Sequence, residues 1–344
     1  MRLQDALREA FGAAPVKYRV EAYLRSALPP PPRDVALVTQ GSMDRLPRLR
    51  EQASMWHGTL SVAIYIRPDE QSGAEHAAAL DAIRSLYNEV ESRQQCRLII
   101  SLLYAIDPAN AEHEFDTLYP INALRNVAIR QTEARLIMVI DIDFVPSENF
   151  WEYLSDESRY SLLVERAETL RHVWALVSLE LHEGDYMPLP TTRKQVAAGL
   201  ATSSLVVAEA YLNPAAHMPV GIQEWLQQDD IYGPLDTAEN LSFEPFVLGA
   251  RLLLPLYDER FRGYGWDKTT HAAQLRREGF TYHMLPHHFV VARYHQPTPT
   301  AIRMFHDTGD APRDTLLRMR MEWLYNSFIL QLDEPGYQLP QVSA

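Results

Sequence analysis

The pattern of apolar and polar positions predicts an alternation of strands and helices in the first half of the chain. Short aliphatic and β-branched runs, typical of buried strands, occupy residues 34–40, 60–66, 96–105 and 135–144. Between them, apolar residues recur at helical spacing in residues 42–56, 74–92 and 119–133. Because strands and helices alternate with short connections, we predict an α/β fold with a mostly parallel central sheet flanked by helices.

The N-terminal segment has a different pattern. Residues 3–12 and 17–28 carry apolar residues at helical spacing, and four consecutive prolines follow at residues 29–32. A proline run ends a helix and forms a stiff extended spacer. We therefore predict a helical extension and spacer over residues 1–32, and a single domain over residues 33–344.

The second half is less regular but continues the same domain. Its pattern predicts helices at residues 149–156, 191–201, 267–277 and 312–331. It predicts strands at residues 173–182, 204–210, 244–252 and 281–294, and a long loop at residues 222–240. Long loops at one end of a sheet often carry binding residues.

Composition and charge exclude several classes of protein. The 344 residues are 47% apolar and 22% charged, which is ordinary for a globular domain. The net charge of −13 argues against a nucleic-acid binder, and no apolar run approaches the roughly 20 residues of a membrane span. The single cysteine, Cys96, cannot form an intrachain disulfide. No G-x-G-x-x-G follows the first strand, which argues against a dinucleotide-binding domain.

Two acids, Asp141 and Asp143, lie at the end of the predicted strand RLIMVIDIDF. Ligands of open α/β sheets bind at the carboxyl ends of strands, and the strand period places both carboxylates on one face, about 7 Å apart. Such carboxylates repel each other unless a cation lies between them, and Mg²⁺ or Mn²⁺ suits these ligands. We interpret D-I-D as a D-x-D site that binds a metal and a nucleotide-sugar diphosphate; the alternative is a solvated strand end.

Sequence blocks on both sides of D-I-D resemble glycosyltransferase family 49, which contains the LARGE-type xylosyl/glucuronyltransferases and a β-1,4-glucuronyltransferase. Residues 119–154 carry YP-x-N-x-L-R-N-V-A, the strand, D-I-D-F-x-P and a following helix. Further blocks that resemble the family are LVTQGSMDRL (37–46), W-x-G-x-x-S-x-A-x-Y (56–65), FEPF (243–246), YDERFRGYGWDK (257–268) and LPHHFVVARYH (285–295). Together the blocks span residues 35–296.

The resemblance implies a GT-A fold, a UDP-sugar donor, Mn²⁺ (or Mg²⁺) as cofactor and inverting transfer of glucuronate or xylose to a glycan acceptor. Residues 33–150 are then the donor half, residues 151–311 the acceptor half and residues 312–331 a C-terminal helix. Relatives of this family work in the Golgi lumen, so that compartment is expected if an anchor preceded this chain, and the cytoplasm otherwise.

The resemblance also implies a metal site. Asp143 is expected to bind the ion directly, and Asp141 to contact the ion, the ribose or a metal-bound water. A C-terminal histidine completes many GT-A sites, and His295 matches a second histidine of LARGE-type members, whereas relatives tend to carry a histidine at the position of Ala292. A purely structural His295 is the alternative, and His287 and His288 are further candidates.

Four polar residues are expected to bind the donor. Thr39 and Gln40 follow the first strand, where they could meet the uracil and ribose or simply cap a turn. Arg125 and Asn126 lie on the helix before D-I-D. An arginine among apolar residues needs an anion, and its fork suits a diphosphate or a glucuronate carboxylate; the alternative is a salt bridge, including one to the D-x-D acids.

An inverting transferase needs a general base for the acceptor hydroxyl. Glu244 in F-E-P-F and Asp267 in G-Y-G-W-D are the candidates. Relatives often carry asparagine at the position of Asp267, which could instead cap the helix that follows, and Glu244 could instead pair with an arginine. Two other functions compete with the transferase: a non-catalytic carbohydrate-binding relative, and a D-x-D phosphohydrolase, for which no second cluster of acids and histidines is evident.

Overall fold

The computed structural model describes residues 16–106, 114–182, 188–209, 213–217, 220–238, 240–305 and 309–339. The helix predicted at residues 3–12 lies outside these ranges. Within them, no helix is both long and apolar enough to cross a membrane.

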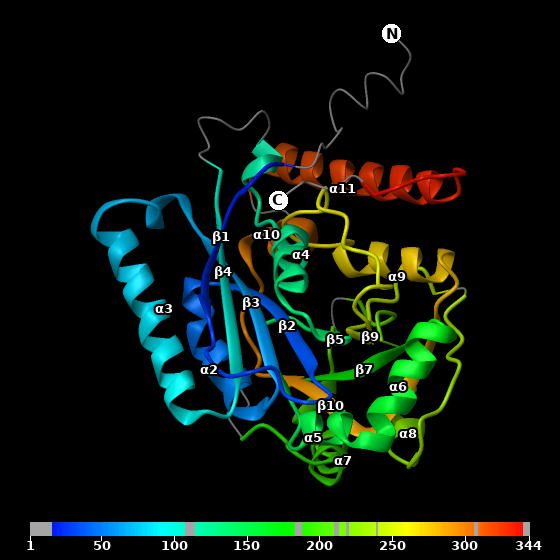
Figure 1. The fold of residues 1–344 in the computed structure, drawn as a ribbon. Coiled ribbons are helices and arrows are strands. Elements are labelled where there is room, and N and C mark those ends of the chain that lie inside the picture. The colour runs from blue at the N-terminus through cyan, green and yellow to red at the C-terminus, as the bar shows by residue number, and fades with distance from the viewer. Residues whose placement is uncertain are drawn as a thin grey trace.

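A mixed ten-stranded sheet forms the centre of the molecule, in the order β1-β4-β3-β2-β5-β9-β7-β10-β6, with β8 paired to β7 (Figure 1). Strands β4, β3, β2 and β5 are mutually parallel, and so are β7 and β10. The strands are β1 (Arg19–Arg25), β2 (Val35–Ser42), β3 (Thr59–Ile66), β4 (Arg97–Tyr104), β5 (Leu136–Val139), β6 (Phe144–Pro146), β7 (His172–Leu181), β8 (Leu205–Val207), β9 (Val247–Ala250) and β10 (Thr281–Ala292). The parallel centre predicted from the continuous apolar runs is confirmed.

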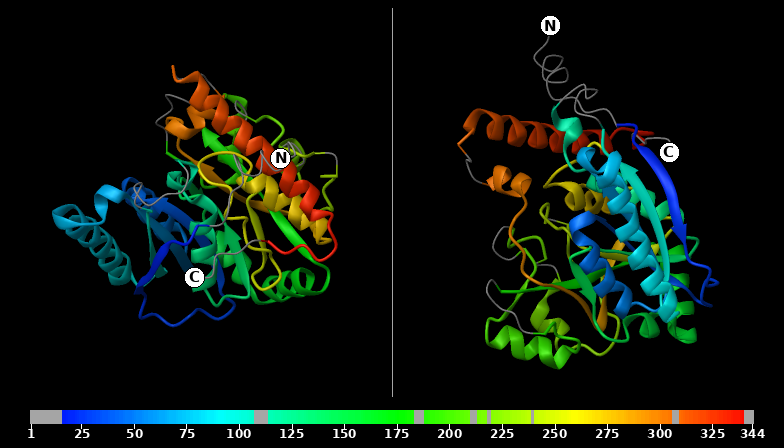
Figure 2. Two further views of the ribbon diagram at one scale, coloured as in Figure 1. Left: turned by 90° about the horizontal axis from the view of Figure 1, so that it is seen from above. Right: turned by 90° about the vertical axis from the view of Figure 1, so that its left-hand side faces the viewer.

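Helices cover both faces of the sheet (Figures 1 and 2). The α-helices are α2 (Leu46–Met55), α3 (Gly73–Arg93), α4 (Ile121–Gln131), α5 (Phe150–Ser155), α6 (Glu157–Thr169), α7 (Arg193–Ala201), α8 (Ile222–Trp225), α9 (Asp267–Arg277), α10 (Pro299–Phe305) and α11 (Ala311–Leu332). One apolar core joins the sheet to α2, α3, α5 and α6, and a second joins its other face to α4, α7 and α9. A third cluster packs α11 alongside α9. This arrangement, a central sheet with helices on both faces, is the α/β architecture expected for the chain.

The helix predicted at residues 17–28 is wrong. Residues 19–25 form β1, which pairs antiparallel with β4 at the edge of the sheet. Its side chains are mostly exposed or half-buried, so the apolar spacing that suggested a helix does not reflect a buried helical face. Pairing with β4 satisfies the backbone and overrides the local propensity. The sheet therefore begins before the proline spacer, although the predicted domain boundary lies at residue 33.

Candidate active site

The carboxyl ends of β2 and β5 meet the amino end of the antiparallel β9 at one edge of the sheet. Val38 pairs with Val139, and Val139 pairs with Val247. The segments that follow β2 and β5 and precede β9 therefore lie at this edge. It brings Asp141 together with Glu244, two candidates that are far apart in the sequence.

The strand predicted over residues 135–144 ends earlier than expected. β5 stops at Val139, and a turn follows in which the Phe144 N–H donates to the Asp141 carbonyl at 3.1 Å. The Nε2 of Gln52, on α2, donates to the carbonyls of Asp141 (3.2 Å) and Phe144 (2.7 Å). The two acids thus lie in a turn clamped to α2, and their side chains meet different partners.

Asp141 lies among cations. Its Oδ1 accepts hydrogen bonds from Arg125 Nη2 (2.6 Å) and Gln40 Nε2 (3.2 Å), and its Oδ2 is 3.8 Å from Lys268 Nζ. Burial alone would raise the pKa of this carboxyl, but Arg125 and Lys268 outweigh it and hold the pKa below its usual value. Asp141 is therefore an ionised carboxylate at neutral pH.

Asp143 presents its two oxygens to different groups. Oδ1 accepts from Arg45 Nη1 at 2.9 Å, whereas Oδ2 lies 3.7 Å from His295 Nε2. His295 Nδ1 is 3.1 Å from the Gln296 carbonyl, so an Nδ1–H donated there would leave Nε2 as the ligand atom. Since a divalent ion lies about 2 Å from each ligand, one ion could bind both Asp143 and His295.

The three predicted metal ligands are not assembled into one cluster. Across the described part of the chain, no group of three or more acidic, histidine or cysteine side chains is arranged to hold an ion. Asp143 and His295 fit a metal, because a carboxylate oxygen suits Mn²⁺ or Mg²⁺ and imidazole is a common metal ligand. Asp141 instead binds cationic side chains. His287 and His288 contact Asp229 and Ser147, away from the D-x-D turn.

Arg125 is an internal ion-pair residue. Its side chain is 1% exposed, and Nη1 donates to Asp267 at 2.6 Å while Nη2 donates to Asp141 at 2.6 Å. A third bond joins Nη1 to Asn122 at 3.0 Å. The salt bridge to a D-x-D acid, which was the alternative interpretation, is thus present. Arg125 fastens α4 to α9 and to the D-x-D turn.

Asn126 is also occupied by structural contacts. Its Nδ2 donates to the Tyr257 carbonyl (2.9 Å) and to Glu259 (2.8 Å), and its Oδ1 accepts from the Tyr257 N–H (2.9 Å). These bonds hold segment 257–259 against α4, and they do not support a donor-binding role for Asn126.

Thr39 and Gln40 lie at the end of β2, as predicted. Thr39 is 0% exposed, and its Oγ1 has no hydrogen-bond partner among the residues that the structure describes. Gln40 accepts a hydrogen bond from the Tyr119 hydroxyl and donates to Asp141. Gln40 thereby orients the Asp141 carboxylate, while its contact with a nucleoside stays a prediction.

Lys268 connects the two sides of the site and was not predicted. Its Nζ lies 3.5 Å from Glu244 Oε2 and 3.8 Å from Asp141 Oδ2. Burial would lower its pKa, but Asp267, Asp141 and Glu244 outweigh burial and raise the pKa well above its ordinary value. The ammonium is therefore a permanent charge between these carboxylates. In the sequence it is one lysine beside an acid, and only the fold reveals its neighbours.

The pKa values of the two candidate bases, Glu244 and Asp267, shift in opposite directions. Burial raises the pKa of Glu244, although Lys268 opposes the shift, and Asn213 Nδ2 donates to its Oε1 at 2.8 Å. Burial would also raise the pKa of Asp267, but Lys268 and Arg125 outweigh it and lower the pKa to about 2. A carboxylate with a raised pKa is the stronger base. The directions of these pKa shifts therefore favour Glu244, whereas Asp267 serves as a counter-ion of Arg125.

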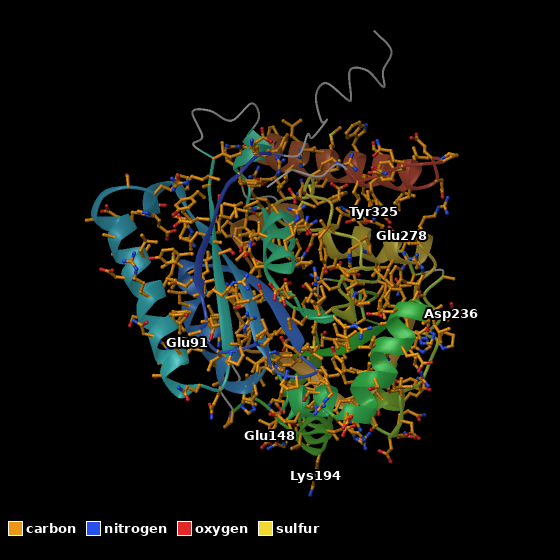
Figure 3. All side chains as sticks on the ribbon, in the orientation of Figure 1. Glu91, Glu148, Lys194, Asp236, Glu278 and Tyr325 are labelled. Carbon is orange, nitrogen blue, oxygen red and sulfur yellow. The ribbon has the colours of Figure 1, made fainter. Side chains whose placement is uncertain are left out.

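The aromatic residues beside Asp267 take part in packing. Trp266 stacks on Tyr325 of α11, with ring centroids 4.1 Å apart; Tyr325 is labelled in Figure 3. The Tyr264 hydroxyl donates to Glu209 at 3.2 Å. Trp266 thus helps to hold α11 on the loop before α9.

Removing the Arg125 charge is expected to destabilise the fold. Arg125→Met leaves Asp141 and Asp267 without their closest cation, and breaking a buried ion pair costs about 3–5 kcal/mol. Urea unfolding would measure the loss, with Arg135→Met as the matched control. Arg135 pairs with Glu168 and is 58% exposed, so its loss should cost less than about 1 kcal/mol. Equal small losses in both variants would contradict the structural role of Arg125.

Several known proteins resemble the chain. It is 28% identical over 270 residues to mouse "Xylosyl- and glucuronyltransferase LARGE2", covering 78% of this chain and 36% of that protein. It is 30% identical over 270 residues to chicken "Xylosyl- and glucuronyltransferase LARGE2s", covering 78% of this chain and 33% of that protein. The chain thus spans about a third of the length of these relatives.

A solved structure and a family profile complete the comparison. The structure of S. aureus TarS 1-349 in complex with UDP is a distant match, with a TM-score of 0.37 and 11% identity over 85% of this chain and 72% of that one. The profile of the family described as "Glycosyl-transferase for dystroglycan" matches residues 34–102 and 87–300. Because these matches cover more than half of the chain, the chain belongs to this family, glycosyltransferase family 49.

Proposed function

We propose that the chain is a metal-dependent glycosyltransferase that moves a sugar from a UDP-sugar to a glycan acceptor with inversion at the anomeric carbon. The observation that carries the proposal is the placement of the D-x-D turn and Glu244 on either side of Lys268, at the carboxyl edge of the sheet. Such a transfer needs a turn that binds the donor and, at the same end of the sheet, a carboxylate that can act as the general base. Membership of the family, and relatives named xylosyl- and glucuronyltransferases, support xylose or glucuronate as the sugar.

In this proposal, Asp143 and His295 hold the Mn²⁺ or Mg²⁺ ion. Their facing atoms lie 3.7 Å apart, and the donor set suits such an ion. When bound, the ion would supply Lewis-acid stabilisation of the leaving UDP diphosphate. Asp141 is ionised and accepts hydrogen bonds from Gln40 and Arg125. It belongs to the same turn as Asp143 and would contribute negative charge near the ion while keeping these two hydrogen bonds.

Glu244 is the proposed base. Its raised pKa makes it a stronger proton acceptor than an ordinary glutamate. It takes the proton from the acceptor hydroxyl as that oxygen attacks the anomeric carbon. The nearby Lys268 ammonium opposes protonation of Glu244 before the substrate arrives, and so preserves the ionised form that accepts the proton. Asn213 fixes the other carboxylate oxygen.

A panel of UDP-sugars tests this function. The chain is incubated with UDP-glucuronate, UDP-xylose, UDP-glucose, UDP-galactose or UDP-N-acetylglucosamine, with Mn²⁺ or with EDTA, and released UDP is measured. Slow hydrolysis of UDP-glucuronate or UDP-xylose that requires Mn²⁺ is the expected result. If no donor is hydrolysed but the chain still binds glycans, the non-catalytic carbohydrate-binding interpretation replaces this one.

A further inference from the structure

Two arginines beside the D-x-D turn have no role in the function proposed above. Arg45 precedes α2 and Arg48 lies in its first turn, directly after the strand that carries Thr39 and Gln40. The Arg45 guanidinium donates to Asp143 at 2.9 Å, and Arg48 Nε lies 3.9 Å from the same oxygen. Both side chains are 24% exposed, so solvent and ligands can reach them.

Most of the hydrogen-bonding capacity of these two groups is unused by the protein. A guanidinium carries five N–H donors. Within the described residues, Arg45 donates one hydrogen bond to another side chain, Asp143, and Arg48 donates one, to Glu51 at 3.2 Å. The remaining donors are available to a ligand that offers several oxygen acceptors.

Ion pairs with nearby acids occupy only part of each guanidinium. Asp44 Oδ2 lies 3.5 Å from Arg45 Nε, while Asp44 Oδ1 accepts from Ser42 at 2.6 Å and from Arg67 at 2.6 Å. Exposed ion pairs also contribute little to stability. By contrast, Arg50 on the same helix donates to Glu89 at 2.8 Å, which is an ordinary pairing with α3 and lies away from the turn.

We propose that Arg45 and Arg48 bind the diphosphate of the nucleoside diphosphate donor. This inference rests on the proposed function and assigns residues to its leaving group. The guanidinium fork matches phosphate oxygens. The pair lies between the end of β2, where the nucleoside is expected, and Asp143, where the metal ligands meet. In a chain with a net charge of −13, such local cations are needed to attract an anionic substrate.

The experiment compares the double variant Arg45→Gln/Arg48→Gln with wild type by calorimetric titration of UDP and of uridine. Each titration is made with Mn²⁺ and with EDTA, so that an indirect effect through Asp143 on the metal is separated from a direct contact. The expected result is a loss of UDP affinity of about tenfold or more in both conditions, with uridine affinity unchanged. Arg50→Gln is the matched control and should bind both ligands as wild type does.

A second variant keeps the test valid if the glutamine variant folds poorly. Arg45→Lys/Arg48→Lys keeps both positive charges but loses the planar guanidinium that can donate two parallel hydrogen bonds. UDP affinity should then lie between those of wild type and the glutamine variant. Unchanged UDP binding, an equal loss of uridine binding, or a loss seen only with Mn²⁺ would each overturn the direct contact while leaving the proposed function intact. A wild-type chain that binds no UDP in either condition would overturn the proposed function itself.

Discussion

Replacing Asp143 by asparagine is expected to slow Mn²⁺-dependent UDP-sugar hydrolysis by about a hundredfold to a thousandfold, because metal stabilisation of the leaving group is worth several kcal/mol. The amide keeps the shape of the side chain but removes the negative charge that faces His295. Initial rates over a range of Mn²⁺ concentrations measure the effect, and the concentration needed for half-maximal rate should also rise.

Asp81→Asn is the matched control for this change. Asp81 is an exposed carboxylate on α3 that pairs with Arg84 at 3.2 Å, so its neutralisation alters the same total charge without touching the site. The control should retain the wild-type rate. Both variants should unfold at nearly the wild-type temperature, because neither carboxylate is fully buried. An Asp143→Asn variant with wild-type hydrolysis would show that the metal assignment is wrong.

Replacing Glu244 by glutamine is expected to reduce sugar transfer by about a hundredfold to ten-thousandfold, the usual contribution of a positioned base. The oxygen of the new amide could still accept the hydrogen bond from Asn213, so the fold should be preserved. Donor binding should be little affected, since the contacts of Glu244 are with Lys268 and Asn213 and not with Asp143 or His295. The measurement is the transfer rate to the best acceptor, beside the affinity for UDP.

The pH dependence of transfer provides an independent test of the same residue. A base acts in its ionised form, so transfer should fall as the pH drops through the pKa of Glu244. Because burial raises this pKa, the fall in transfer rate at low pH should be centred above the ordinary pKa of a glutamate, about 4.3. This fall, the acid limb of the pH–rate profile, should vanish in Glu244→Gln. In Glu168→Gln, which removes an exposed partner of Arg135, the limb should persist. A limb that survives in Glu244→Gln would assign the base elsewhere.

The parallel half of the fold could be predicted because its strands are buried on both faces. Every residue of β3 and of β4 is buried, so each appears in the sequence as a predominantly apolar run. Helix α3 shows its buried stripe through Ile83, Leu86 and Val90. Where burial is continuous or periodic, the pattern of apolar and polar residues reveals the element and its approximate ends.

The remainder depends on contacts between distant residues. β1 is a partly exposed edge strand that is stabilised by pairing with β4, and its local pattern does not reveal this. The D-x-D acids were found because they end an apolar run. The acidic partners of Arg125 are Asp141 and, 142 residues away, Asp267, and no local pattern indicates which acid an arginine meets.

A Mn²⁺ titration followed by electron paramagnetic resonance tests whether the D-x-D turn holds the donor metal. The free-ion signal is titrated with wild type, Asp143→Asn and Glu244→Gln, each with and without UDP. If Asp143 and His295 hold the ion, wild type and Glu244→Gln should remove the free-ion signal, more strongly when UDP is present, and Asp143→Asn should not. Equal Mn²⁺ binding by wild type and Asp143→Asn, or no binding by wild type even with UDP, would contradict a donor-metal site at the D-x-D turn.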